Sequence, residues 1–209
     1  MVNDKCKICR RLGQKLFLKG DRCFSPKCAM IKRAYPPGPE KKRRKRAFSE
    51  YKKALSEKQK LKNWYGLREA QFKKYVKETL AKRGKVEDLS NELIGRLEKR
   101  LDNIVFRLGF GKSRSHARQL VSHGYFLVNN KPVNIPSFEV KKGDVVALKQ
   151  GKKAKNIFKE IITLLKKKES ILWLELDKEK LEGKIKEEPS LKEITPPAEI
   201  STIFEFYSR

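Results

Sequence analysis

Apolar side chains recur at helical spacing through the middle of the chain and predict two long helical segments. The first extends from Ser49 to about Leu80, and one face of it carries Phe72, Tyr75, Val76, Thr79 and Leu80. The second begins near Ser90, a suitable N-cap, and its apolar stripe comprises Leu93, Leu97, Leu101, Ile104, Val105 and Leu108. Gly109 ends this second segment, because glycine readily adopts the left-handed conformation that terminates helices.

The hydrophobic pattern changes after residue 124 and predicts strands. Residues 125–128 and 131–133 flank Asn129-Asn130, a pair that tolerates the positive φ angles of a tight hairpin turn. A second turn at Lys142-Gly143-Asp144 leads into a strand over residues 145–148. We therefore expect helices followed by a small β-sheet.

A short helix between these two regions carries the most informative polar side chains. We expect Ser113 to cap it, and we expect its apolar residues Ala117, Leu120 and Val121 to face the preceding helix. Arg114 and Arg118 lie one turn apart on its polar side, near an N-terminus whose N–H groups attract phosphate. Any exposed helix could carry two arginines, and that alternative stays open. We expect residues of the hairpin to lie beside this helix, and the candidate RNA contacts here are Lys112, Ser113, Arg114, Ser115, Arg118, Gln119, His123, Asn129 and Lys131.

The charge balance points to a polyanionic partner. The 209 residues include 52 Lys and Arg against 25 Asp and Glu, a formal net charge of +27 that is spread along almost the whole length. Such an excess is self-repelling unless a polyanion neutralises it. Nucleic acid is favoured over an anionic membrane, because the sequence has no apolar run of about 20 residues and no separate amphipathic anchor. We also find no secretory signal, so we expect no membrane partner and a cytoplasmic location.

Four cysteines near the N-terminus have the spacing of a metal site. Cys6 and Cys9 form one close pair, Cys23 and Cys28 form another, and the loop between the pairs can return the chain to one tetrahedral site. Zinc is the leading candidate, although four thiolates also hold iron–sulfur clusters. Disulfides and free buried thiols are the remaining alternatives. A closed site of this kind is structural rather than catalytic.

A run of six basic residues, 41–46, follows a proline-rich elbow at 35–39. We interpret Arg43, Arg44 and Arg46 as part of an arm that follows phosphates, although such runs also act as solvated linkers or localisation signals. The sequence shows no phosphate-binding glycine loop and no catalytic motif. We therefore predict that the protein is not an enzyme.

Many separated stretches resemble bacterial-type small-subunit ribosomal protein S4, in its metal-binding version with four cysteines. The stretches that carry the resemblance are Cys6–Gly13, Leu16–Gly20, Cys23–Ala29, Glu57–Leu61, Arg100–Asn103, Ala117–Val121, Val133–Ser137, Gly143-Asp144, Trp173-Leu174 and Glu205–Arg209. They occur in the family's order and cover nearly the whole chain. Lys58 and Lys60 belong to the stretch that resembles the start of the helical domain, and we include both among the candidate RNA contacts.

The resemblance implies an α+β fold in which a small RNA-binding domain, two helices plus a small β-sheet, is inserted into a mostly helical domain. The implied divisions are 1–46 for the zinc-type module and basic arm, 47–98 for the helical domain, and 99–150 for the insertion. Residues 151–209 would then comprise a Lys-rich helix and a C-terminal segment that returns to the helical domain.

The resemblance also implies a function. Family members are structural constituents of the small ribosomal subunit, bind its 16S-type rRNA as primary binders, and nucleate assembly. The implied partners are messenger RNA, where Arg43, Arg44 and Arg46 would act, and the neighbouring fifth and third small-subunit proteins, with a role in translational accuracy. Two alternatives remain: an RNA-modifying enzyme that carries a similar small domain, and a zinc-finger regulator that binds nucleic acid.

Overall fold

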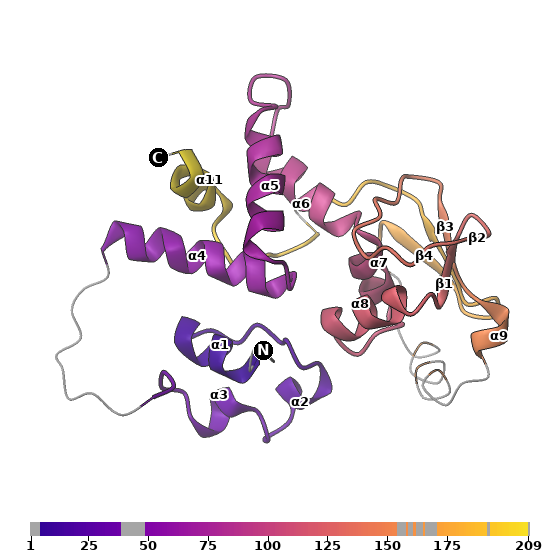
Figure 1. Cartoon of the computed structure of the whole chain (residues 1–209), viewed down its shortest axis with the longest axis horizontal. Helices are drawn as coiled ribbons and strands as arrows, with labels where there is room; N and C mark the ends of the chain where they lie inside the picture. Colours follow the sequence, from indigo (N-terminus) through magenta and orange to yellow (C-terminus); the bar gives the residue numbers. More distant parts are fainter. Residues whose placement is uncertain are drawn as a thin grey trace. The chain divides into compact units, whose positions relative to one another are not determined.

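The computed structural model describes residues 5–38, 49–153, 171–191 and 193–208, together with Phe158, Ile161 and Leu165 (Figure 1). Arg43, Arg44 and Arg46 lie outside the described residues. The chain divides into two compact units: Met1–Leu93 with Thr195–Arg209, which we call the helical unit, and Ile94–Ile194, which we call the sheet unit. Within the described ranges no helix is both long and apolar enough to cross a membrane.

The helical unit begins with three short helices around the cysteines. They are α1 (Lys5–Leu12), α2 (Asp21–Phe24) and α3 (Ala29–Lys32), and α1 contacts both α3 and the following long helix. Leu16 is buried, and so are Cys9, Cys23 and Cys28. The apolar centre of this segment is therefore small and made largely of thiols.

Three longer helices pack together in the same unit. They are α4 (Glu50–Trp64), α5 (Glu69–Leu80) and α11 (Ile200–Ser208), and α11 packs against both α4 and α5. The single helix that we predicted from Ser49 to Leu80 is wrong, because the chain turns between residues 65 and 68. Gly66 adopts φ 64° there, and Tyr65 and Leu67 on either side are buried. Packing of these two side chains stabilises a break that the apolar spacing alone does not reveal.

The sheet unit combines helices with one antiparallel sheet. The boundary between the two units falls within α6 (Leu89–Glu98), whose first turn Asp88 caps by accepting a hydrogen bond from the Ser90 N–H. The helices α7 (Leu101–Leu108) and α8 (Arg114–Ser122) follow. The strands are β1 (Phe126–Val128), β2 (Lys131–Pro132), β3 (Val145–Leu148), β4 (Leu174–Asp177) and β5 (Glu182–Ile185), in the order β2-β1-β3-β5-β4. A short helix α9 (Gln150–Lys153) follows β3.

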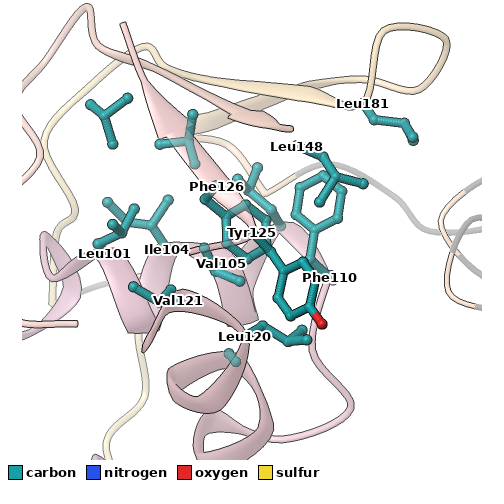
Figure 2. Close-up of a cluster of buried hydrophobic side chains, with 14 of the residues drawn as sticks. Leu101, Ile104, Val105, Phe110, Leu120, Val121, Tyr125, Phe126, Leu148 and Leu181 are labelled. Carbon is teal, nitrogen blue, oxygen red and sulfur yellow. The ribbon is translucent and has the colours of Figure 1, made fainter. Parts of the chain in front are cut away.

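The core of the sheet unit lies between its helices and its sheet (Figure 2). Leu101, Ile104 and Val105 of α7 and Leu120 and Val121 of α8 point into it. The contacts that we predicted between the apolar side of the short helix and the preceding helix are therefore confirmed. The ring centroids of Phe110 and Phe126 lie 5.5 Å apart, edge to face, among these residues.

The predicted hairpin is confirmed. Val128 pairs with Lys131, and Asn129 and Asn130 adopt φ 49° and 64° in the turn between them. Two successive positive φ angles are typical of a type I′ turn, whose twist matches that of the flanking strands. Strand β3 then pairs with β1 through Val128 and Val146.

The continuous helix predicted from Ser90 to Leu108 is wrong, because it is broken between α6 and α7. At the break the backbone N–H of Leu101 donates to the Phe138 carbonyl at 2.9 Å, and that of Val140 donates to the Lys99 carbonyl at 2.9 Å. Contacts with a distant loop therefore replace the helical hydrogen bonds at this point, although the apolar stripe continues.

The sheet unit also extends beyond the predicted division at residue 150. Strands β4 and β5 join the sheet, with Val146 opposite Gly183, and Trp173 is buried in the core. Phe158, Ile161 and Leu165, at helical spacing, are buried in the same core. Of the C-terminal segment that we expected to return to the helical domain, only residues from Thr195 onward belong to the helical unit.

Candidate nucleic-acid interface

The candidate interface is built on the N-terminal turn of α8. Ser113 caps the helix by accepting a hydrogen bond from the His116 N–H at 3.3 Å, as predicted. Gly111 lies directly beneath this turn, where an added Cβ would come within 2.8 Å of the Ala117 Cβ. The absence of a side chain at residue 111 therefore allows α8 to approach the preceding segment closely.

Asp102 of α7 is a buried carboxylate that holds two arginines. Arg100 donates from Nε and Nη2 to its two oxygens, at 3.1 and 2.9 Å. Arg118 donates from Nε to Oδ2 at 2.7 Å, across from α8. The side chain of Asp102 is only 3% exposed and that of Arg118 is 31% exposed. One buried acid thus fixes an arginine that reaches the surface.

Glu98 is the second buried carboxylate and holds two further arginines. Arg107 binds it with two hydrogen bonds of 2.8 and 2.7 Å. Asn103 donates to the same carboxylate and accepts a hydrogen bond of 2.8 Å from Nε of Arg114. The Arg114 guanidinium also lies 4.8 Å from the centre of the Phe106 ring, a cation–π geometry. Nη2 of Arg114 lies 3.8 Å from Oε1 of Glu98, so Arg114 has three partners, Asn103, Phe106 and Glu98, and its side chain is only 12% exposed.

The side chains joined by these contacts form a cluster that we call the arginine cluster: Glu98, Arg100, Asp102, Asn103, Arg107, Arg114 and Arg118. Its four guanidinium groups outnumber its two carboxylates, so the cluster retains an excess of positive charge at a partly buried position. Positive charge in such surroundings is screened less than at an open surface and attracts anions more strongly. Ser115 and Gln119 are exposed on α8, and Lys112 is exposed immediately before the Ser113 cap. The polar side of α8 is therefore not an ordinary solvated helix face.

Sequence reasoning missed the two acids that organise this site. The signal available was the acidic residue at 102 inside the apolar stripe, between Leu101 and Ile104, within a stretch that we read only as part of a resemblance. An acid on the buried side of an apolar stripe requires a cationic partner, since an isolated buried charge is strongly unfavourable. The arginines one turn apart on the next helix were the obvious partners.

The two histidines take structural positions. The Lys112 backbone N–H donates to Nδ1 of His116 at 3.3 Å, and burial together with the positive charge of Lys112 lowers the pKa of His116. His123 is exposed and stacks on the Tyr125 ring, with the two ring centroids 6.1 Å apart. Of the two, only His123 remains a candidate for contact with RNA.

Asn129 and Lys131 lie at the β1–β2 hairpin, which Figure 1 shows apart from α8 within the sheet unit. The expectation that they lie beside this helix is wrong. Asn129 bridges the turn instead, because its amide donates to Asp144 at 2.8 Å and accepts from the Val145 N–H at 2.9 Å. Lys131 is exposed on the edge strand β2. These two residues form a separate candidate contact.

Lys58 and Lys60 do not present open cationic groups to a phosphate. Lys60 pairs with Glu57 at 2.6 Å, and Lys58, whose side chain is 8% exposed, pairs with Glu69 at 2.8 Å. The Lys58 ammonium also lies 4.6 Å from the centre of the Phe206 ring. Both lysines therefore stabilise the packing of the helical unit, and the geometry gives no support to their role as RNA contacts.

Glu69 is the acceptor at the centre of that packing. Burial opposes its ionisation, but hydrogen bonds from Lys58, Lys62 and Tyr207 outweigh burial and hold the pKa of Glu69 at about 2. Burial and the adjacent Glu69 carboxylate raise the pKa of Tyr207. The bond from the Tyr207 hydroxyl to Glu69, 3.0 Å long, ties α11 to α5.

The four cysteines line one small pocket, together with Lys5, Lys15, Leu18, Lys19, Ala29 and Met30. None of them forms a disulfide. The Lys19 N–H donates to Sγ of Cys23 at 3.3 Å, and burial raises the pKa of Cys9. Across the described ranges, however, no three His, Cys, Asp or Glu side chains converge as a formed metal site would require. The thiols gather as the sequence spacing predicted, without the geometry of a metal-binding centre.

A basic helix capped at its N-terminus, packed on a second helix and followed by a small antiparallel sheet, defines a compact nucleic-acid-binding module. Comparison with known families agrees with this class: residues 99–146 match the family described as S4 domain. Residues 2–98 match the family described as Ribosomal protein S4/S9 N-terminal domain. The two matches adjoin within the chain.

Curated relatives cover the whole chain. The chain is 47% identical over 209 residues to a protein of Caldicellulosiruptor saccharolyticus named small ribosomal subunit protein uS4, covering 100% of this chain and 98% of the relative. It is 44% identical to the protein of the same name from Thermotoga petrophila, over 98% of this chain and 96% of the relative. It is 42% identical to the protein of the same name from Thermus thermophilus, over 100% of this chain and 98% of the relative. The chain belongs to the uS4 family of small ribosomal subunit proteins.

Family membership confirms the predicted function at this level. The protein is a structural component of the small ribosomal subunit that binds rRNA, and it is not an enzyme. The two alternatives, an RNA-modifying enzyme and a zinc-finger regulator, are thereby set aside. The names of these relatives state no metal, so the four-cysteine metal-binding version of the family gains no support from them.

Proposed function

We propose that the arginine cluster is the principal rRNA contact of this protein and that it acts on the cytoplasmic ribosome as a primary binder during small-subunit assembly. The observation that carries the proposal is the buried pair of acids, Glu98 and Asp102, which fix more arginines than they neutralise. Arginines with their rotamers already fixed lose little entropy when they bind a phosphate. Exposed Lys112 and Gln119 extend the same surface.

Recognition of this kind reads the position of phosphates rather than base edges. The grooves of A-form RNA hide most base edges, and phosphate contacts set register and affinity. A rigid array of guanidinium groups suits an RNA junction, where several phosphate backbones converge. Each phosphate neutralised should steepen the dependence of log K on log salt concentration by roughly 0.7 to 0.9.

The test compares two double variants that remove the same charge from the sheet unit. Lys112→Ala with Arg118→Ala changes the proposed interface, and Arg100 remains to neutralise Asp102. Lys184→Ala with Lys186→Ala changes two exposed lysines at β5 and serves as the matched control. In a salt titration with purified small-subunit rRNA, we expect the first pair to lower the slope by roughly 1 to 2 and the control pair to leave it nearly unchanged. Equal effects of both pairs would mean that only net charge matters.

We also propose contacts with messenger RNA and with the third and fifth small-subunit proteins, with an effect on translational accuracy. The helical unit offers one feature that suits a basic protein neighbour: a pocket between α4 and α11 that includes Glu50, Glu57, Glu199 and Glu205 in its lining. Basic ribosomal proteins complement such a surface. If Glu199→Lys with Glu205→Lys leaves capture of the fifth and third proteins by the full chain unchanged, this docking face is wrong.

We also propose that the four cysteines, which line one pocket, bind a structural metal ion. A bound zinc ion would link α1 to the segment that carries Cys23 and Cys28, a part of the chain too small to form a large core. Elemental analysis of the purified chain should find about one zinc per molecule, and Cys9→Ser with Cys28→Ser should abolish it. Metal-free protein with unchanged thermal unfolding in chelator would contradict the site.

A further inference from the structure

Two phenylalanines of the cysteine-bearing segment stack on each other at the surface. The ring centroids of Phe17 and Phe24 lie 4.9 Å apart, with 26° between the ring planes. Phe24 is 73% exposed and Phe17 is 44% exposed. We call these residues the aromatic pair. Exposing so much aromatic surface is unfavourable in water, so the pair requires an explanation beyond folding of the chain.

The backbone holds both rings outside the core. Leu16 and Cys23, which immediately precede the two rings, are buried. Phe17 itself adopts φ 53°, in the left-handed region that bulky side chains rarely occupy. A strained backbone that directs a large apolar ring toward solvent is typical of a functional surface rather than of a packing defect.

The surroundings of the aromatic pair are basic. The Lys15 ammonium lies 5.3 Å from the centre of the Phe17 ring. Lys19, Arg22 and Lys27 are exposed in the same short segment, where Asp21 is the one acidic residue. The patch therefore combines a flat aromatic surface with cations, the two features with which proteins bind unpaired nucleotides.

We propose that the aromatic pair is a stacking site for an unpaired RNA nucleobase. The base extends the existing stack on the outer face of Phe24, and the neighbouring lysines and arginine contact the flanking phosphates. Stacking is tolerant of base identity, because every base has an aromatic face. This site deepens the proposed rRNA-binding function and rests on it, but it lies in the helical unit and uses none of the residues of the arginine cluster. It would recognise a bulged or looped nucleotide rather than a helix.

The test separates bases from phosphates. The full-length protein is titrated with a ten-nucleotide oligoadenylate and with an abasic oligonucleotide of equal length and charge. We expect the wild type to prefer the oligoadenylate, and Phe24→Ala to reduce that preference by about 5- to 10-fold. Phe24→Tyr should retain the preference, whereas Phe24→Leu, which keeps apolar area without a ring face, should lose it. Ile31→Ala, which changes a 60% exposed apolar residue in the same segment, is the matched control and should bind as the wild type does.

Two further measurements keep the outcomes distinct. In Phe24→Trp, quenching of indole fluorescence on addition of oligoadenylate, but not on addition of the abasic strand, would report the stack directly.

Binding of purified small-subunit rRNA is measured in parallel. If the wild type binds that rRNA but Phe24→Ala leaves the base preference unchanged, the stacking site is wrong and the proposed function stands. If rRNA binding itself is absent, the proposed function fails first. Loss of incorporation into small subunits without any change in RNA binding would assign the pair to a protein neighbour and would overturn the proposal.

Discussion

Arg118 of α8 and Asp102 of α7 are joined by a hydrogen bond of 2.7 Å between Nε and Oδ2. The bond links the helix proposed to contact rRNA to a carboxylate that is 3% exposed. Because Arg100 occupies the same carboxylate, Asp102 sets the positions of two guanidinium groups at once. This relationship connects the stability of the sheet unit with its capacity to bind RNA.

Replacing Asp102 should therefore affect both properties. Asp102→Asn keeps the size of the side chain but leaves Arg100, 4% exposed, without its neutralising charge. We expect a loss of about 3 to 5 kcal/mol of unfolding free energy, measured by urea denaturation. Glu175→Gln is the control, since Glu175 forms an exposed ion pair with Lys186 and should cost less than about 1 kcal/mol. Equal costs for the two variants would mean that burial of the Asp102 pair is energetically unimportant.

The close approach at Gly111 makes a second prediction. Gly111→Ala brings a Cβ within 2.9 Å of the Ala117 backbone nitrogen, so α8 must shift. We expect a loss of about 1 to 3 kcal/mol in thermal or urea unfolding and weaker rRNA binding, because the shift moves Arg114 and Arg118. Gly151→Ala, at a helical position with open space around it, should be neutral or slightly stabilising. If Gly111→Ala retained full stability, the fit of α8 would be looser than the structure indicates.

Acid should weaken the helical unit through Glu69. Its pKa is about 2 in the folded protein, against an ordinary value of 4.5, so the folded state favours the ionised form. The resulting stability is fully present above about pH 4.5 and is lost as the pH falls toward 2. Because the Glu69 side chain is 45% exposed, we expect solvent to limit the effect to about 1 kcal/mol or less.

The measurement is the urea midpoint of unfolding at pH 6 and at pH 3. Glu69→Gln should remove this part of the pH dependence, whereas Glu205→Gln, an exposed acid on α11, should leave it in place. An unchanged pH dependence in Glu69→Gln would show that the three donors to this carboxylate contribute nothing measurable.

The hairpin turn offers a matched pair of substitutions. Asn130→Gly should be neutral or stabilise by up to about 1 kcal/mol, because glycine adopts its φ of 64° without strain. Asn129→Gly should instead cost about 1 to 2 kcal/mol, because it removes the hydrogen bonds to Asp144 and from the Val145 N–H. Thermal unfolding of the two variants checks the difference, and the opposite order would refute the bridging role of Asn129.

The features that sequence predicted well depend on a few neighbouring residues. The Ser113 cap needs only the next turn of helix, and the Asn129-Asn130 turn needs only its flanking strands. The gathering of the cysteines also followed from short spacings. Each of these is a local rule that operates before distant parts of the chain are placed.

The features that sequence did not predict depend on distant partners. Apolar periodicity continues through the break before Leu101, where a hydrogen bond to the Phe138 carbonyl ends the helix. Strand β5 has no strong pattern of its own and is fixed by pairing with β3, some forty residues earlier in the sequence. The arginines of α8 were identified as candidates, but which side chains of α6 and α7 each of them contacts is decided by tertiary packing.

The insertion of one unit within the other has a consequence during synthesis. Helix α11 packs on α4 and α5, so the helical unit lacks one of its three long helices until residues beyond Thr195 have been added. The sheet unit is continuous in sequence and is polymerised entirely before that point. On a growing polypeptide, the sheet unit, which carries the arginine cluster, can therefore fold first. The helical unit, although its synthesis begins earlier, can complete its fold only after α11 has been made.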